Sequence, residues 1–85
     1  MDNLIVTLTN PQKSFFYDVE IPSSLSVEKL KGDIVEALVA YDSNIMLKNE
    51  NCILFCNRLN RQLDNAETPL SAGVWNGDYI TVMEA

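Results

Sequence analysis

The arrangement of apolar residues in the first half of the chain is the strongest constraint on its fold. In residues 4–9 and again in residues 14–21, apolar and polar side chains alternate, which predicts two half-buried strands. Pro11 separates them, because its ring fixes φ and it lacks an N–H group. Two alternating strands around a short turn predict an antiparallel hairpin. After Pro22 the apolar residues recur at helical spacing: Val27, Leu30, Ile34, Leu38 and Tyr41.

The predicted helix has Ser26 as its expected N-cap and is expected to end near residues 40–42. The remaining apolar runs predict three shorter strands: residues 52–56, 61–63 and 79–83. A hairpin, a crossing helix and three further strands favour one mixed sheet with the helix on one face, an α+β roll. The first and last strands are expected to lie side by side and parallel at its centre.

Two connections carry apolar residues that are expected to face inward. A turn or short 3₁₀ helix beginning at Thr68 would place Leu70 and Val74 against the core. The irregular segment after the helix contains the apolar residues 45–47, which are expected to turn inward. The Asn-Gly-Asp sequence at 76–78 is a strong turn signal before the last strand.

Length and charge exclude several classes of protein. A chain of 85 residues is expected to form one domain, residues 1–85, because a second core does not fit in this length. Its net charge of −6 argues against binding to nucleic acid or to anionic lipid. No apolar run approaches the ~20 residues of a membrane span, so direct membrane insertion is not expected. The acidic start does not resemble a signal peptide, and a cytoplasmic location is expected.

The residue types that carry most catalytic chemistry are scarce. The chain has no histidine, which removes His-activated nucleophiles and most zinc sites, and its three glycines form no phosphate-binding pattern. Cys52 and Cys56 lie on one face of the same predicted strand, roughly 13 Å apart at about 3.3 Å per residue. That exceeds disulfide reach, so free thiols in a reducing compartment are expected. We therefore expect no enzyme activity, no cofactor and no metal site.

The chain resembles ubiquitin over nearly its whole length, mostly in the pattern of its core. The similar segments are residues 4–9 with the following turn, residues 19–31, and residues 53–71. This resemblance implies a ubiquitin-like β-grasp roll, in which a mixed sheet of four to five strands packs on one helix. It is specific for fold and says little about function.

The segment LSAGVWNGDYI, residues 70–80, narrows the resemblance. It is similar to the L-S-x-x-G-I-x-x-G-D-x-[LI] ending of YukD/EsaB-like proteins, small ubiquitin-like components of bacterial type VII (WXG100/ESX-like) secretion systems. The resemblance implies a non-catalytic protein-binding module that is an accessory or regulatory part of such a machine. In actinobacterial machines a similar domain is fused to a membrane subunit, which implies a membrane-embedded or ATPase subunit as the partner.

Two other functions remain open at this point. One is a generic ubiquitin-like adaptor outside secretion. The other is a relative of the ThiS/MoaD-type sulfur carriers, which share the fold but end in Gly-Gly. No glycine follows Gly77, so activation of the C-terminus and isopeptide formation are not expected.

The resemblance also implies where a partner would bind. It places Ile53 inward and Leu54 outward, and the outward residue would centre an exposed patch with three neighbours: Met83, Leu8 and Thr81. The alternative is that Leu54 is a scattered exposed apolar residue, which is common. Trp75, next to the Asn-Gly-Asp turn, is either an interface anchor or a cap over the edge of the core.

The charged side chains are expected to be solvated. Arg58, Arg61 and Lys31 belong to this group. Asp18 with Glu20 form a same-face carboxylate pair, as do Asp33 and Glu36, and a charged solvent face is favoured for both pairs over acid catalysis.

Overall fold

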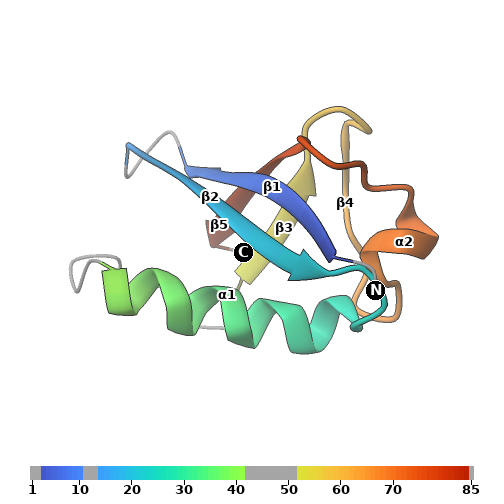
Figure 1. Cartoon of the computed structure of the whole chain (residues 1–85), viewed down its shortest axis with the longest axis horizontal. Helices are drawn as coiled ribbons and strands as arrows, with labels where there is room; N and C mark the ends of the chain where they lie inside the picture. The colour runs from blue at the N-terminus through green and yellow to red at the C-terminus, as the bar shows by residue number, and fades with distance from the viewer. Residues whose placement is uncertain (1–2, 11–13, 42–51, 85) are drawn as a thin grey trace.

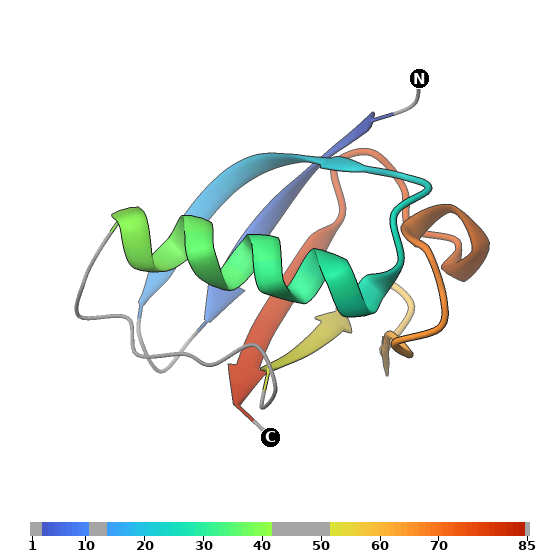
Figure 2. The same cartoon turned by 90° about the horizontal axis from the view of Figure 1, so that it is seen from below.

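Helix α1 packs on one face of a five-stranded mixed sheet (Figures 1 and 2). The computed structural model describes residues 3–10, 14–41 and 52–84. The elements along the chain are β1 (Asn3–Asn10), β2 (Phe15–Pro22), α1 (Val27–Tyr41), β3 (Cys52–Cys56), β4 (Arg61–Gln62), α2 (Pro69–Ala72) and β5 (Tyr79–Glu84). The strand order is β2-β1-β5-β3-β4, and β1 runs parallel to β5 at the centre while the other pairs are antiparallel. The predicted hairpin, mixed sheet and central parallel pair are confirmed.

The hairpin and helix form where their periodic patterns predict. β1 and β2 pair over their full length, from Asn3 opposite Pro22 to Asn10 opposite Phe15. Ser26 is confirmed as the N-cap of α1, because its hydroxyl accepts a hydrogen bond from the N–H of Lys29 at 3.4 Å. The helix ends at Tyr41, inside the predicted range.

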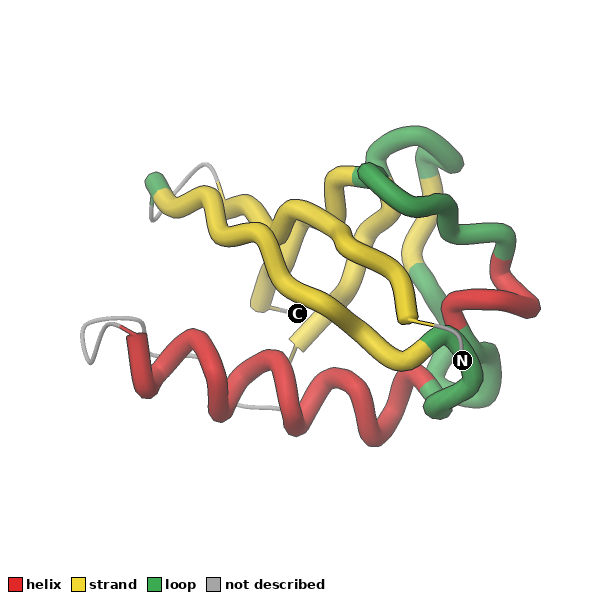
Figure 3. The backbone as a smooth tube through the Cα atoms, in the orientation of Figure 1, coloured by secondary structure: helices red, strands yellow, loops and turns green. Residues whose placement is uncertain are grey.

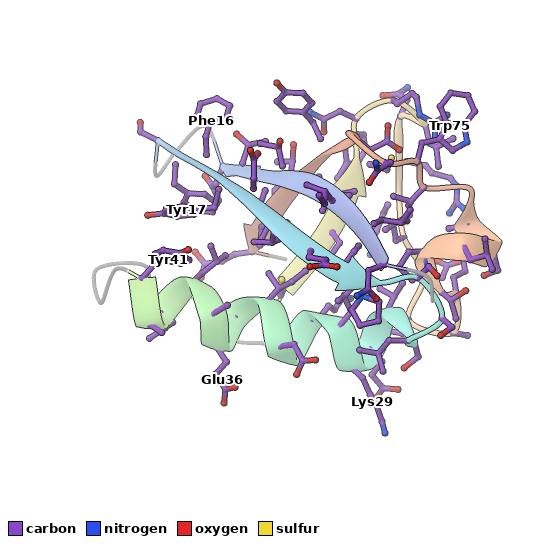
Figure 4. The ribbon with its side chains drawn as sticks, viewed as in Figure 1. Phe16, Tyr17, Lys29, Glu36, Tyr41 and Trp75 are labelled. Carbon is purple, nitrogen blue, oxygen red and sulfur yellow. The ribbon has the colours of Figure 1, made fainter. Side chains whose placement is uncertain are left out.

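The core lies between α1 and the inner face of the sheet. From α1 it receives Val27, Leu30, Ile34 and Leu38. From the sheet it receives alternate residues of four strands, including Val6, Leu8, Phe15, Ile21, Cys52, Leu54, Cys56, Ile80 and Val82. Tyr41, the last residue of the predicted stripe, is 67% exposed and instead stacks on Tyr17, with 4.7 Å between the ring centroids (Figure 4).

The expected orientation of β3 is wrong. Leu54 is only 1% exposed, and Leu8 is fully buried, so neither side chain reaches the surface. Leu54 lies opposite the buried Val82 of β5, whereas Ile53 lies opposite Met83 on the other face of the sheet. Because side chains alternate along a strand, a shift of one residue exchanges the two faces of β3.

The connection before β5 differs from its prediction in one side chain. It forms the short helix α2, which is capped by Thr68 and ends at Gly73 in the left-handed conformation, φ 87°. Leu70 is 68% exposed instead of inward, because Pro69 and Ala72, three positions apart, form the buried side of the turn. Val74 is buried, as predicted.

Three further points concern the sequence expectations. The apolar residues 45–47 lie outside the described residues. Cys52 and Cys56 are free, as expected, and both are buried because they share the inward face of β3 with Leu54. Across the three described stretches, no helix combines the length and apolar character needed to cross a bilayer.

Candidate functional site

The face of the sheet turned away from α1, here called the outer face, carries a row of uncharged side chains across all five strands. The strand pairings place its members side by side in this order: Phe16, Thr9, Thr81, Phe55 and Gln62. Phe16 is 70% exposed, while Phe55 and Thr81 are half-buried. At about 4.8 Å between strands, the row from β2 to β3 spans about 14 Å.

A second pair of apolar residues lies beside this row. Ile53 and Met83 are direct cross-strand neighbours on β3 and β5, and both are half-buried on the outer face. We call the five residues Phe16, Ile53, Phe55, Thr81 and Met83 the outer patch. The hydroxyl of Thr81 donates to the side-chain oxygen of Asn57 at 2.7 Å, which fixes the rotamer of the polar member of the patch.

The other end of the outer face is charged. The hydroxyl of Thr7 donates to Asp18 at 2.7 Å, and the amide of Asn3 donates to Glu20 at 3.0 Å. These carboxylates follow Phe16 along β2 and face solvent. The two carboxylates lie on this part of the outer face together with the exposed side chains of Ile5 and Tyr79. This placement agrees with the expectation that Asp18 and Glu20 form a charged pair exposed to solvent.

The structure brings together only part of the predicted patch. Met83 and Thr81 lie on the outer face, whereas Leu54 and Leu8 are in the core. Phe55, and not Leu54, is the outward residue of β3 beside Thr81. The alternation in β3 places Cys52, Leu54 and Cys56 on one face and Ile53 and Phe55 on the other, but it does not show which of the two faces is inward.

Trp75 is held in a fixed position at the far end of the sheet from the C-terminus of α1 (Figure 4). Its ring is stacked on the guanidinium of Arg58, whose central carbon lies 3.7 Å from the ring centroid. The residue is 63% exposed, so it does not cap the core, and Val74 fills the inward position. The loops that carry Arg58 and Trp75 lie side by side in Figure 3. A role for Trp75 in binding a partner stays a prediction.

The buried carboxylate of Asp78 organises this cluster. It accepts from Nε of Arg58 at 2.8 Å, from a terminal nitrogen of Arg58 at 3.0 Å and from the N–H of Trp75 at 2.8 Å. Arg58 also donates to the carbonyl of Gly73. The guanidinium holds the pKa of Asp78 below its usual value, despite burial that acts in the opposite direction. Arg58 is thus an ion-pair partner of Asp78, and its side chain is also partly exposed, in line with the expectation that it is solvated.

Two other basic side chains are also engaged. Arg61 makes a paired contact with the carboxylate of Glu67, at 3.0 and 2.8 Å, which lowers the pKa of Glu67 to about 2. Lys31 is buried, and its ammonium group donates to the side-chain oxygen of Asn65 at 2.6 Å. Both contacts join β4 and α1 to the loop before α2, which indicates a structural role.

The residues most relevant to catalytic chemistry are the potential metal ligands and the thiols. Within the residues that the structure covers, no group of three or more His, Cys, Asp or Glu side chains is placed to hold a metal ion. Burial raises the pKa of the Cys52 thiol to about 11, which disfavours the reactive thiolate.

The comparisons with known proteins identify the fold. No family model and no curated protein sequence matches the chain. Among solved structures, the ubiquitin-like domain of Plasmodium falciparum Dsk2 superposes with a TM-score of 0.77 at 15% identity, covering 99% of this chain and 100% of that one. A ubiquitin-like domain from Arabidopsis thaliana gives 0.76 at 19% identity, covering 99% and 79%. Ubiquitin of Caldiarchaeum subterraneum gives 0.73 at 16% identity, covering 99% and 95%. The fold is therefore the ubiquitin-like β-grasp.

Proposed function

We propose that this protein is a non-catalytic protein-binding module whose contact surface is the outer patch. The observation that carries the proposal is the grouping of Phe16, Ile53, Phe55 and Met83 on one half of the sheet face that α1 leaves uncovered. Aromatic residues and methionine are enriched in protein interfaces, where charged side chains are depleted at the centre. The carboxylates of Asp18 and Glu20 on the same face then lie at the rim on one side.

The shape of the patch favours a protein surface over a small ligand. The patch lies on the open face of a sheet, whereas small-molecule sites are concave and enclose most of their ligand. Phe55 lies at the β3 end of the patch, between its β5 neighbour Thr81 and Gln62 of β4. Truncation of an aromatic hot-spot residue costs an interface about 2 kcal/mol or more.

For the partner, we propose a membrane-embedded or ATPase subunit of a bacterial type VII secretion machine, reached from the cytoplasmic side. The similarity of residues 70–80 to the ending of YukD/EsaB-like proteins supports this choice. In the structure, this segment forms α2, the turn that presents Trp75, and the start of β5. A generic ubiquitin-like adaptor uses the same surface with a different partner, so the identity of the captured protein separates the two functions.

The test is affinity purification of the tagged chain from its native host, followed by mass spectrometry. We expect the wild type to capture a secretion-machine subunit, such as the FtsK/SpoIIIE-like ATPase. The variant Phe55→Ser combined with Met83→Ser should lose that subunit. Leu70→Ser is the matched control, because Leu70 is an exposed apolar residue on α2, outside the outer patch.

The outcomes test separately whether the outer patch is the contact surface and which protein binds it. If the double variant folds and still captures the subunit, the outer patch is not the contact surface, and Trp75→Ala becomes the next variant. Reproducible capture of a protein unrelated to secretion, lost in the double variant, supports the adaptor. A genome in which neither WXG100 genes nor such an ATPase lies beside this gene would also argue against the secretion role.

A further inference from the structure

Three large side chains are exposed together at the end of the sheet that the outer patch leaves free. Ile5, Tyr79 and Trp75 are 54%, 50% and 63% exposed, and we call these three residues the end surface. Hydrogen bonds join their segments, because the N–H of Gly77 donates to the carbonyl of Ile5 and the N–H of Ile5 donates to the side-chain oxygen of Asn76, both at 2.7 Å. A Cβ on Gly77 would meet no atom within 4 Å beyond its chain neighbours, so the space over this turn is open.

Trp75 is fixed in place before any partner binds. Its ring stacks on the guanidinium of Arg58, its backbone N–H donates to Asp78 at 2.8 Å, and Asp78 in turn binds Arg58. Figure 4 shows the indole at the end of the domain, on the side of the sheet away from α1. A rigid aromatic side chain supplies contact area at a low cost in conformational entropy, which suits it as a binding anchor. The charge of Arg58 is already paired, so it does not set the charge of the end surface.

The side chains that flank the end surface on β2 are acidic. Glu20 lies opposite Ile5, and Asp18 lies opposite Thr7, and both carboxylates are exposed. Thr7 also lies opposite Tyr79, so Asp18, Thr7 and Tyr79 form one row across three strands. A partner that covers Tyr79 therefore gains from a basic side chain placed two strands away.

The spacing of this row favours one backbone conformation in the partner. Two strand spacings of about 4.8 Å place Asp18 and Tyr79 about 9.6 Å apart. A polyproline II helix has three residues per turn and rises about 3.1 Å per residue, so side chains three positions apart are separated by about 9.3 Å on one edge. A β-strand and an α-helix return to the same face after about 6.7 and 5.4 Å. Aromatic side chains are also the surface on which proline-rich segments bind.

We propose that the end surface binds a proline-rich segment of another protein in the polyproline II conformation, with an arginine or lysine three positions from a proline. The proline packs on Tyr79, and the basic side chain pairs with Asp18 or Glu20. The segment continues over Gly77 toward Trp75, whose fixed ring contacts a further proline. The end surface shares no residue with the outer patch, and the inference does not rest on the proposed function.

The probes are two blocked heptapeptides of the same composition. Arg-Ala-Pro-Pro-Ala-Pro-Pro has prolines three and six positions after the arginine, whereas Arg-Pro-Pro-Ala-Pro-Pro-Ala has alanines there. Binding is followed by the fluorescence of Trp75, the single tryptophan of the chain, and by nitrogen–proton correlation NMR. We expect the first peptide to change the fluorescence and to shift the amide signals of β1, Tyr79 and residues 75–77. The second peptide should bind at least about fivefold more weakly.

One pair of variants tests the aromatic contact. Tyr79→Ser removes the ring on which the proline packs and should weaken binding of the first peptide about fivefold. Phe16→Ser is the matched control, because Phe16 is an exposed aromatic residue on the same face of the sheet but belongs to the outer patch. It should change the affinity less than about twofold. A native-like NMR spectrum establishes that each variant is folded.

A second pair tests the charges and does not depend on the folding of Tyr79→Ser. Asp18→Asn combined with Glu20→Gln should weaken binding about threefold and reduce its dependence on salt, because exposed ion pairs are lost. Asp33→Asn combined with Glu36→Gln removes the same two charges from the exposed side of α1 and should leave the affinity unchanged.

Several results would overturn the inference. They are equal affinity for the two peptides, unchanged affinity in a folded Tyr79→Ser variant, equal weakening by the two pairs of carboxylate substitutions, or shift changes confined to the outer patch. The variant that combines Phe55→Ser with Met83→Ser should keep its affinity for the first peptide. A failure of this inference and a failure of the proposed function are therefore distinguishable.

Discussion

Replacement of Asp78 by asparagine tests whether one buried carboxylate fixes the far end of the domain. Asp78 is 6% exposed and accepts hydrogen bonds from both Arg58 and the backbone of Trp75. Asparagine keeps the shape of the side chain but presents one oxygen and one amino group. If the oxygen stays on the Trp75 N–H, the amino group opposes Nε of Arg58, and two donors face each other.

The size of the stability loss in Asp78→Asn follows from the hydrogen bonds that are lost. A charge-assisted hydrogen bond contributes about 1.5–3 kcal/mol when its partners are buried. The side chain of Arg58 is 32% exposed, so water compensates part of the loss. We expect Asp78→Asn to lower the free energy of unfolding by about 2 kcal/mol. For a domain of this size, that corresponds to a fall in Tm of about 8–16 °C.

Urea unfolding followed by tryptophan fluorescence measures this directly, because Trp75 is the single tryptophan of the chain. Arg58→Met and the double variant complete a mutant cycle. The losses of unfolding free energy in the two single variants should together exceed the loss in the double variant by about 1 kcal/mol. The pKa of Asp78 is lowered in the folded protein, so its ionised form stabilises above its usual pKa. The difference between wild type and Asp78→Asn should therefore shrink as the pH falls below that value. A loss under about 0.5 kcal/mol, or a difference independent of pH, would refute the reasoning.

Three further predictions follow from burial and charge. Leu54→Ala should lower the free energy of unfolding by about 2–5 kcal/mol and Phe55→Ala by less than half as much, and equal urea midpoints would contradict the orientation of β3. The pKa of Glu67 falls from 4.5 to about 2 beside Arg61. The ionised carboxylate therefore stabilises the folded protein above pH 4.5, and this stabilisation is lost as the pH falls toward 2. Glu67→Gln should remove the loss of stability between these two pH values, as measured by acid unfolding. Cys52 should stay unmodified by a thiol reagent at pH 8 until urea unfolds the protein, because burial raises its pKa to about 11.

The hairpin and α1 were predictable because each has one apolar and one polar face. In β2, the inward Phe15 and Ile21 alternate with Phe16, Asp18 and Glu20, and the carboxylates identify the solvent side. In α1, the stripe that begins at Val27 has charged residues on the other side. Where polar residues mark the outside, the period of the apolar residues alone defines the buried face.

The orientation of β3 was not predictable in this way. Its sequence, Cys-Ile-Leu-Phe-Cys, is apolar on both faces, so alternation divides the residues into two sets without showing which set is inward. The choice depends on the pairing with β5, where Leu54 meets Val82 and Ile53 meets Met83. That register joins segments about thirty residues apart, and no local signal defines it.

The Arg58 cluster was missed for a related reason. Arg58 lies in the turn after β3, and Trp75 and Asp78 lie in the turn before β5, so only the folded sheet brings them together. The Gly-Asp sequence at 77–78 was interpreted as a turn signal. The carboxylate does stabilise that turn through the N–H of Trp75, but it also binds the arginine.

The core places few constraints on the outer patch. Phe55 and Met83 alternate with core residues on β3 and β5, so a change in the outer patch leaves the inward residues of these strands in place. The three solved structures compared above share the fold while only 15–19% of their residues are identical to this chain. If the outer patch is the contact surface, its residues can differ between proteins of this fold without loss of the core, and partner choice is then encoded in the patch.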